Sequence, residues 1–267
     1  MRHEGKLEAP AAKGAALHIL SNMTSTEFAA LARRCRSAIL PVGATEGHGP
    51  HLPLSTDWVI GVETAQRAAQ ALLAEGIEVL LLPPILYGVT RSTADYPGTV
   101  TISEATLAAL VKDVLASVIA QGFTNLCITN HHLAPEHLGT LFKVKAELEA
   151  EHRARVAVPN MRKPAFAGEP TREFKEGAIH GGSFETSLVL QAQPELVHLD
   201  RARTLQPVWK SIAAGRQFGA KTLREAGGVD GYFGDPAAAT PEEGEYFYDA
   251  MVRLVVAAVK AGLAATA

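Results

Sequence analysis

The segment from Ser37 to Asp57 reads SAILPVGATEGHGPHLPLSTD. Residues 37–42 form an apolar run, which is typical of a buried strand. Residues 44–56 form a polar loop rich in glycine, histidine and proline. Asp57 can then cap a helix with an apolar face, which stops before Gly76. The segment therefore predicts a strand, a loop and a helix in direct succession.

The same order of strand and helix continues along the chain. Further apolar runs predict strands at 77–82, 124–129 and 155–158. Amphipathic helices are expected after the capping box of Thr24 and Glu27, after Ser103, from Pro135, at 183–192 and at about 242–263. Apolar strands that alternate with helices are typical of a parallel sheet covered on both faces. No repeat or linker interrupts the pattern, so residues 1–267 are expected to form a single α/β domain.

The composition is that of an ordinary globular protein. The 267 residues are 47% hydrophobic and 20% charged, with a formal net charge of −3, which argues against disorder, a membrane-spanning chain and recruitment of nucleic acid by net charge. Cys35 and Cys127 are too few for a disulfide framework, which favours a reducing, cytoplasmic location. Residues 1–20 are expected to be a flexible N-terminal extension, not a targeting segment. Ten histidines, most beside glycine, proline or an acid, are the one unusual feature.

Two histidine-rich loops, 46–51 and 130–132, directly follow predicted strands. Because ligands bind beyond the carboxyl ends of parallel strands, both loops are expected at the same edge of the sheet. Glu46 and His48 are two residues apart, so in an extended segment their side chains point the same way. Asp57 can offer two oxygens to two cations, and the mixed imidazole and carboxylate set suits Zn²⁺ or Mn²⁺. The alternative is that Glu46 pairs with a base and the histidines pack polar turns.

A third polar segment, HGGSFETS at 180–187, opens a predicted helix. Glu185 falls in the first turn, where the helix dipole alone favours a carboxylate, or where it could be a metal ligand. His180 has the intrinsic pKa of a general acid or base near neutral pH. The adjacent His131 and His132 do not readily bind one ion together, so one can ligate while the other faces substrate or solvent. For any single histidine, a hydrogen-bonded structural role is the commoner one.

Taken together, these segments resemble the creatininase family, the creatinine amidohydrolases and their relatives. The run EGHGPHLPLSTD at 46–57 is similar to the family's E-x-H-G-x-H-L-P-x-x-T-D, and HGGSFETS is similar to its H-[AG]-G-x-x-E-T-S. The sequences YPGT at 96–99, NHH at 130–132 and GYFGDP at 231–236 resemble its P-G-T, N-G-H and G-D-P segments. The matches run in family order from about Ile39 to Glu245.

The resemblance implies a three-layer α/β/α sandwich with a mostly parallel central sheet, often assembled as a hexamer. It implies two divalent metal ions per chain, Zn and/or Mn, which serve the hydrolysis of C–N bonds in cyclic amides, formamides or short peptides. Glu46 and His132 would hold one metal and His48 the other. Asp57 would bridge the two metals, and Glu185 would complete the ligand set.

The resemblance also implies how the chemistry would proceed. A hydroxide that bridges the metals would attack the amide carbon, and His180 would protonate the leaving nitrogen. Glu185 is a catalytic candidate as well as a ligand. The substrate-binding candidates are His131, Arg91 and Tyr96.

Three departures from the family pattern bear on the substrate. His131 replaces the middle glycine of N-G-H, so it could reach the pocket, bind metal or cap the next helix. Ala134 stands where creatininases proper carry an acidic ligand. The stretch 165–179 lacks their tryptophan and is charged, which weakens the case for creatinine and suggests a more polar substrate, a flexible lid or a solvated surface.

The leading hypothesis is therefore a metal-dependent amidohydrolase that opens a small cyclic amide or lactam. One alternative is a formamide hydrolase on a nucleotide-like substrate, for which Arg91 would contact phosphate. A peptide-cleaving enzyme and a non-catalytic metal-binding protein of the same fold are the others. No thiol nucleophile is expected, because Cys127 lies inside a predicted buried strand.

Overall fold

The computed structural model describes residues 16–161 and 171–266 of the chain. At its centre is a parallel sheet with the strand order β1-β3-β2-β4-β5. The strands are β1 (His18–Ile19), β2 (Ser37–Val42), β3 (Leu80–Leu81), β4 (Asn125–Asn130) and β5 (Arg155–Ala157). β2 and β4 are paired along their whole length, with Val42 opposite Asn130, so both end at the same level of the sheet.

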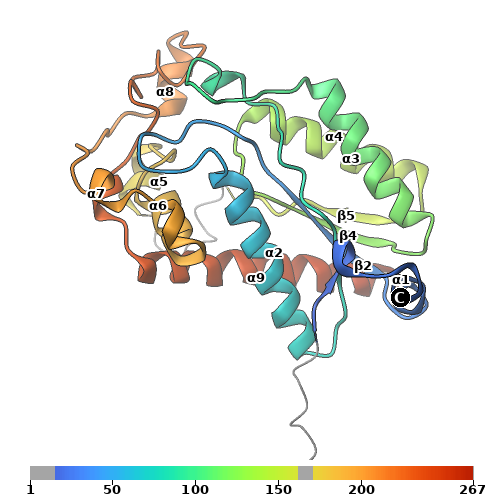
Figure 1. The fold of residues 1–267 in the computed structure, drawn as a ribbon. Coiled ribbons are helices and arrows are strands. Elements are labelled where there is room, and N and C mark those ends of the chain that lie inside the picture. Colours follow the sequence, from blue (N-terminus) through green and yellow to red (C-terminus); the bar gives the residue numbers. More distant parts are fainter. Residues whose placement is uncertain (1–15, 162–170, 267) are drawn as a thin grey trace, which may run out of the picture.

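Helices cover both faces of this sheet (Figure 1). One face packs against α1 (Ser25–Ala32), α3 (Glu104–Ile119) and α4 (Pro135–Glu151). The other packs against α2 (Thr56–Ala74), α6 (Ser183–Ala192) and α9 (Pro241–Thr266). Shorter elements are α5 (Arg172–Glu176), α7 (Leu199–Ala202), α8 (Ile212–Gln217) and 3₁₀ turns at Leu20–Asn22, Arg91–Thr93, Pro194–Leu196 and Pro236–Ala238.

The central strands are buried on both faces. Ala38 and Leu40 of β2 point into the core beneath α3 and α4, whereas Ile39 between them points into the core beneath α2 and α9. In β4, Ile128 and Cys127 are divided between the two cores in the same way. A strand with apolar neighbours on both sides needs an unbroken apolar sequence, which explains why these runs do not alternate. The predicted three-layer α/β/α architecture is confirmed.

Two sequence predictions need correction at the edge of the sheet. The strand expected at 77–82 is only Leu80–Leu81, because Ile77 still donates its N–H to Leu72 at the end of α2. The flexible extension expected over 1–20 is wrong for His18–Ile19, which pairs with β3 as strand β1. The rest of that prediction, for residues 1–15, lies outside the described residues.

No helix within the described ranges combines the length and the apolar character that crossing a membrane requires.

The contact between α9 and α6 depends on a glycine. A Cβ built at Gly244 would overlap the carbonyl oxygen of Ser187, whereas one built at Gly139 of α4 meets nothing within 4 Å. We expect Gly244→Ala to lower the free energy of unfolding by about 1–3 kcal/mol, because overpacking outweighs the roughly 1 kcal/mol gain in helix propensity. Gly139→Ala should gain up to about 1 kcal/mol. Urea denaturation checks both, and equal losses would contradict the steric argument.

Candidate metal centre

Five buried side chains meet at the carboxyl edge of the sheet. Glu46 and His48 lie in the loop after β2, and His132 lies in the loop after β4. Asp57 and Glu185 lie in the first turns of α2 and α6. All five are at most 4% exposed. The prediction that the two histidine-rich loops share one edge of the sheet is confirmed, because the strands that precede them are neighbours.

The His132 ring is held by a backbone carbonyl group. Its Nε2 lies 2.9 Å from the carbonyl oxygen of Val89, and since that oxygen can only accept, Nε2 carries the proton. The lone pair of Nδ1 then faces Glu46 Oε1 at 3.0 Å and Asp57 Oδ2 at 2.9 Å. A lone pair between two carboxylate oxygens is repelled unless a cation or a proton lies among them.

The His48 ring has the same arrangement with its nitrogens exchanged. Nδ1 lies 3.2 Å from the carbonyl oxygen of Glu46, so it carries the proton. Nε2 faces Asp57 Oδ1 at 3.3 Å and Glu185 Oε2 at 3.5 Å. It is buried and has no hydrogen-bond partner among the described residues. A histidine whose second nitrogen bonds a carbonyl is the usual form of a metal ligand.

Asp57 links these two groups. Its Oδ2 belongs with Glu46 and His132, and its Oδ1 belongs with His48 and Glu185. In each group the candidate ligand atoms lie within 4.8 Å of one another. Asp57 does not cap α2 as expected, because the helix already begins at Thr56 and leaves the carboxylate free. The donors therefore fit two cations that share one carboxylate.

The charges of the cluster support each other. Burial opposes ionisation of Glu46, but the nearby His132 outweighs it and lowers the pKa of Glu46 to about 2. Burial likewise opposes a charge on His48, yet Glu185 and Asp57 raise its pKa to about 10. The ionised carboxylates are thus balanced by protons on the imidazoles or by cations that replace these protons. Metal ions bound at these positions would displace the imidazole protons.

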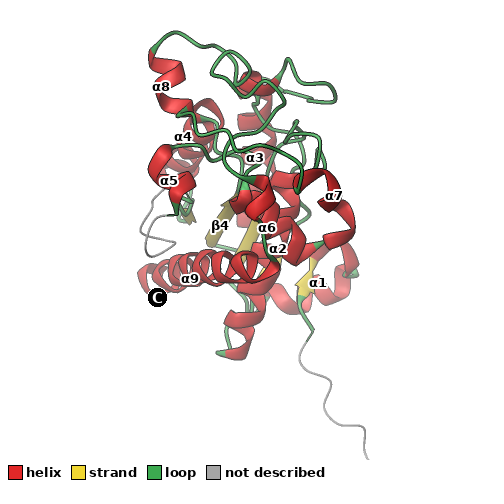
Figure 2. Cartoon of the chain, turned by 90° about the vertical axis from the view of Figure 1, so that its left-hand side faces the viewer, coloured by secondary structure: helices red, strands yellow, loops and turns green. Residues whose placement is uncertain are grey.

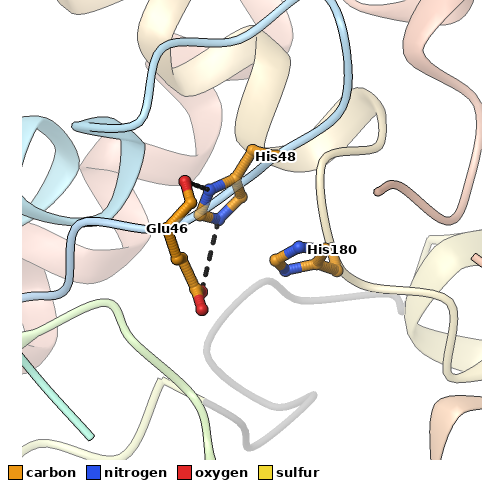
Figure 3. Close-up of side chains that lie close together, drawn as sticks. All are labelled: Glu46, His48 and His180. Atoms are coloured by element: carbon orange, nitrogen blue, oxygen red, sulfur yellow. Dashed lines mark hydrogen bonds and ion pairs between the residues drawn. The ribbon is translucent and has the colours of Figure 1, made fainter. Parts of the chain in front are cut away.

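His180 lies beside the cluster (Figure 3). Its ring stacks on that of His48 with a centroid distance of 4.3 Å, and its Nε2 lies 2.9 Å from the carbonyl oxygen of Gly47. Nε2 therefore carries the proton, and Nδ1 remains a proton acceptor. Burial, together with the charge of His48, lowers the pKa of His180, which favours the neutral ring with a free lone pair at Nδ1. With Glu46 and His48 it also forms a third possible ligand group.

Of the three predicted substrate-binding residues, Arg91 and Tyr96 do not contact the cluster, and His131 contacts Glu185. Arg91 forms a two-point ion pair with the exposed Glu104, which directs its guanidinium outward. Tyr96 is buried, and its hydroxyl donates to the carbonyl oxygen of Gly228, so the ring supports the loop rather than a ligand. His131 is also buried, with Nε2 3.5 Å from Glu185 Oε1.

His131 accordingly lies behind Glu185. Its ring contacts Phe184 with a centroid distance of 5.4 Å, and neither of its nitrogens has a hydrogen-bond partner within the described ranges. It does not cap α4, whose N-cap residue is Ala134. A direct role in the pocket or as a helix cap is therefore not supported.

Several residues that support the cluster were not predicted. The hydroxyls of Thr90 and Thr93 both donate to Glu46 Oε2, the latter at 2.6 Å. His137, which the sequence did not single out, is fully buried and lies edge-on to His132. Its Nδ1 accepts the N–H of Val89, the residue whose carbonyl orients His132. Only the position of His137 five residues after His132 could have drawn attention to it.

Glu173 corrects the expectation of a charged surface over 165–179. It is 2% exposed and accepts backbone N–H groups from Ser183 at 2.7 Å, Phe184 at 3.0 Å and Asp235 at 2.8 Å. These bonds fix the N-terminus of α6, and thereby Glu185. Burial raises the pKa of Glu173 to about 7 despite the three donors. Residues 165–170 of the expected lid lie outside the described residues.

A cavity of about 320 Å³ opens onto the cluster. Its lining includes four of the five candidate ligands, together with His180; the four are Glu46, Asp57, His132 and Glu185. Its walls are mostly apolar and include Leu133, Ala134, Pro135, Ile179, Ile212, Ala213 and Leu223, with Ser92, Thr93, Gly177 and Arg216. This volume lies at the lower end of the range of small-molecule sites, so the cavity suits a small ligand or a short segment of a larger one.

Comparison with known proteins identifies relatives of this chain. The creatininase family model, described as creatinine amidohydrolase, matches residues 21–259. The mycofactocin precursor peptide peptidase of Mycobacterium tuberculosis is 29% identical over 241 residues, covering 88% of each chain. The creatinine amidohydrolase of Pseudomonas putida is 30% identical over 182 residues, covering 61% of this chain and 66% of its own. A solved creatininase variant named as a Zn–Zn type has a TM-score of 0.69 at 26% identity, covering 92% of this chain and 98% of its own.

Proposed function

The chain belongs to the creatininase family of metal-dependent amidohydrolases, and we propose that it hydrolyses a peptide bond in a short peptide. The observation that carries the hydrolytic part is Asp57, whose two oxygens each join a histidine and a glutamate. The peptide part is supported by the similarity to a peptide peptidase that extends over 88% of both chains.

This proposal replaces the cyclic amide or lactam of the leading sequence hypothesis. The similarity to a creatinine amidohydrolase covers a smaller share of the chain, 61%. The tryptophan expected in a creatininase proper is absent from the lead-in to His180. The formamide hydrolase loses its supporting residue, because Arg91 is paired at the surface.

The residues divide into ligands and a proton-transfer group. Glu46, Asp57 and His132 would hold one divalent cation, and His48, Asp57 and Glu185 the other. Zinc or manganese, which this donor set favours, would polarise the peptide carbonyl and activate water. His180 would take up a proton at Nδ1 and deliver it to the leaving nitrogen.

Neighbouring hydroxyl groups fix the orientation of Glu46. Thr90 and Thr93 hold one oxygen of Glu46, which leaves Oε1 directed at His132. A thiolate nucleophile plays no part, since burial raises the pKa of Cys127 to about 12.

The homo-oligomer and the cytoplasmic location stay predictions. Mass photometry would test the oligomeric state.

Metal analysis together with a substrate panel tests the proposal. Purified protein should contain about two divalent ions per chain and should cleave short peptides, losing activity on chelation and regaining it with Zn²⁺ or Mn²⁺. Creatinine and other cyclic amides should remain intact under the same conditions. Less than about half an ion per chain would contradict the metal centre. Turnover of a cyclic amide with peptides untouched would contradict the substrate class, and no turnover at all would favour a binding protein.

A further inference from the structure

Arg216 has no role in the hydrolysis proposed above, yet it lines the same cavity. Its side chain is half-buried on α8, and among the described residues its guanidinium has no ion-pair or hydrogen-bond partner. Lysine is absent from the described lining, and no other arginine lines it. A guanidinium that lines a cavity without a protein partner is available to a ligand that carries the opposite charge.

The position of Arg216 is fixed although α8 is short. The Ser211 hydroxyl accepts the N–H of Ala214, and Ile212 donates its N–H to the carbonyl oxygen of Gly177. In Figures 1 and 2, α8 lies at the top of the molecule, well away from α9. Arg216 therefore lies on a helix that hydrogen bonds anchor to the rest of the protein, and it lines the cavity from there.

The surroundings of Arg216 define the ligand. The nearby cavity wall is apolar, through Ile179, Ile212 and Leu223, while the acidic groups lie at the metal cluster. A charge-assisted hydrogen bond is strengthened where apolar groups exclude water. We propose that Arg216 binds a carboxylate of the substrate, so that the enzyme selects peptides with a carboxylate close to the bond it cleaves. This inference rests on the proposed peptidase function and names its substrate class.

A carboxylate fits better than a phosphate. The planar guanidinium fork matches a carboxylate with two parallel hydrogen bonds. A phosphate dianion offers more oxygens and charge than one guanidinium satisfies, and the described lining adds neither a lysine nor a second arginine. The carboxylate can be the peptide's C-terminus or an acidic side chain, and the experiment below separates these sources.

The test measures binding, so that it does not depend on turnover. The probes are phosphinic pseudodipeptides, whose phosphinate replaces the scissile amide, with a C-terminal carboxylate, with a C-terminal carboxamide, or with a carboxamide and an aspartate side chain. Calorimetry on the metal-loaded enzyme should show that a carboxylate probe binds about 10- to 100-fold more tightly than the plain carboxamide. Arg216→Ala should remove this preference, and Arg216→Lys should keep part of it.

Arg203→Ala, which removes an exposed arginine elsewhere, is the matched control and should keep the full preference. Equal binding of all probes by the wild type would overturn the proposal, as would a preference that survives in Arg216→Ala. The tighter of the two carboxylate probes identifies the source of the carboxylate. If the preference is found but no peptide is cleaved, the peptidase function fails while the carboxylate site stands.

Discussion

Asp57→Asn is expected to abolish peptide hydrolysis and to reduce bound metal to one ion per chain or fewer. The substitution keeps the shape of the side chain but removes the charge that both ligand groups share. The new amide places an NH₂ group opposite either His48 or His132. An amide NH₂ group offers no lone pair to a metal ion, so one of the two ligand groups loses an oxygen ligand. Two cations contribute several kcal/mol to transition-state stabilisation, so we expect a loss of at least about 10³-fold in kcat/KM.

Three measurements separate the effects of Asp57→Asn. Metal analysis counts the ions, peptide assays at saturating Zn²⁺ or Mn²⁺ give the residual rate, and thermal unfolding of the chelated protein reports the fold itself. Asp113→Asn, which neutralises an exposed carboxylate on α3, should leave all three unchanged. Full metal content with full activity in Asp57→Asn would remove this residue from the bridging position.

The sequence was most informative where its signals are local. The apolar runs of β2 and β4 identify buried strands because strands covered on both faces need unbroken apolar side chains. The spacing of Glu46 and His48 in the loop after β2 indicated a ligand pair at the sheet edge, and the family resemblance decided between this role and a structural one. The same rule placed the loop at 130–132 on this edge, since parallel strands end at a common edge, and the family resemblance selected His132 as the ligand.

The supporting residues could not be found in this way because their roles arise from tertiary contacts. Glu173 sits in a charged run that is typical of a solvated surface, and only the fold brings it to the N-terminus of α6. Thr93 is more than forty residues from Glu46 in the chain. Arg91 seemed the natural anion-binding residue, yet Glu104 neutralises it and Arg216 faces the cavity instead. Sequence patterns thus located the candidate ligands better than the walls of the cavity.

His180→Ala is expected to keep the metal content of the wild type and to lose turnover. The ring donates from Nε2 to the Gly47 carbonyl, which fixes its orientation and leaves Nδ1 to exchange protons. General acid–base catalysis of this kind contributes about 10²–10⁴-fold, so kcat should fall by that factor. KM should change little, because the cluster and the cavity wall remain in place.

The alternative role of His180 gives a different result. In the third ligand group, with Glu46 and His48, His180 would itself bind a cation, and the alanine variant would then lose metal as well as activity. Added imidazole separates the two roles further, since it can enter the space left by the ring and restore proton transfer only if both metals are still bound. His198→Ala, which removes an exposed histidine, controls for the loss of an imidazole elsewhere. A variant that keeps metal and retains full kcat would show that the leaving nitrogen takes its proton from another group, for which Glu185 in the same cavity is a candidate.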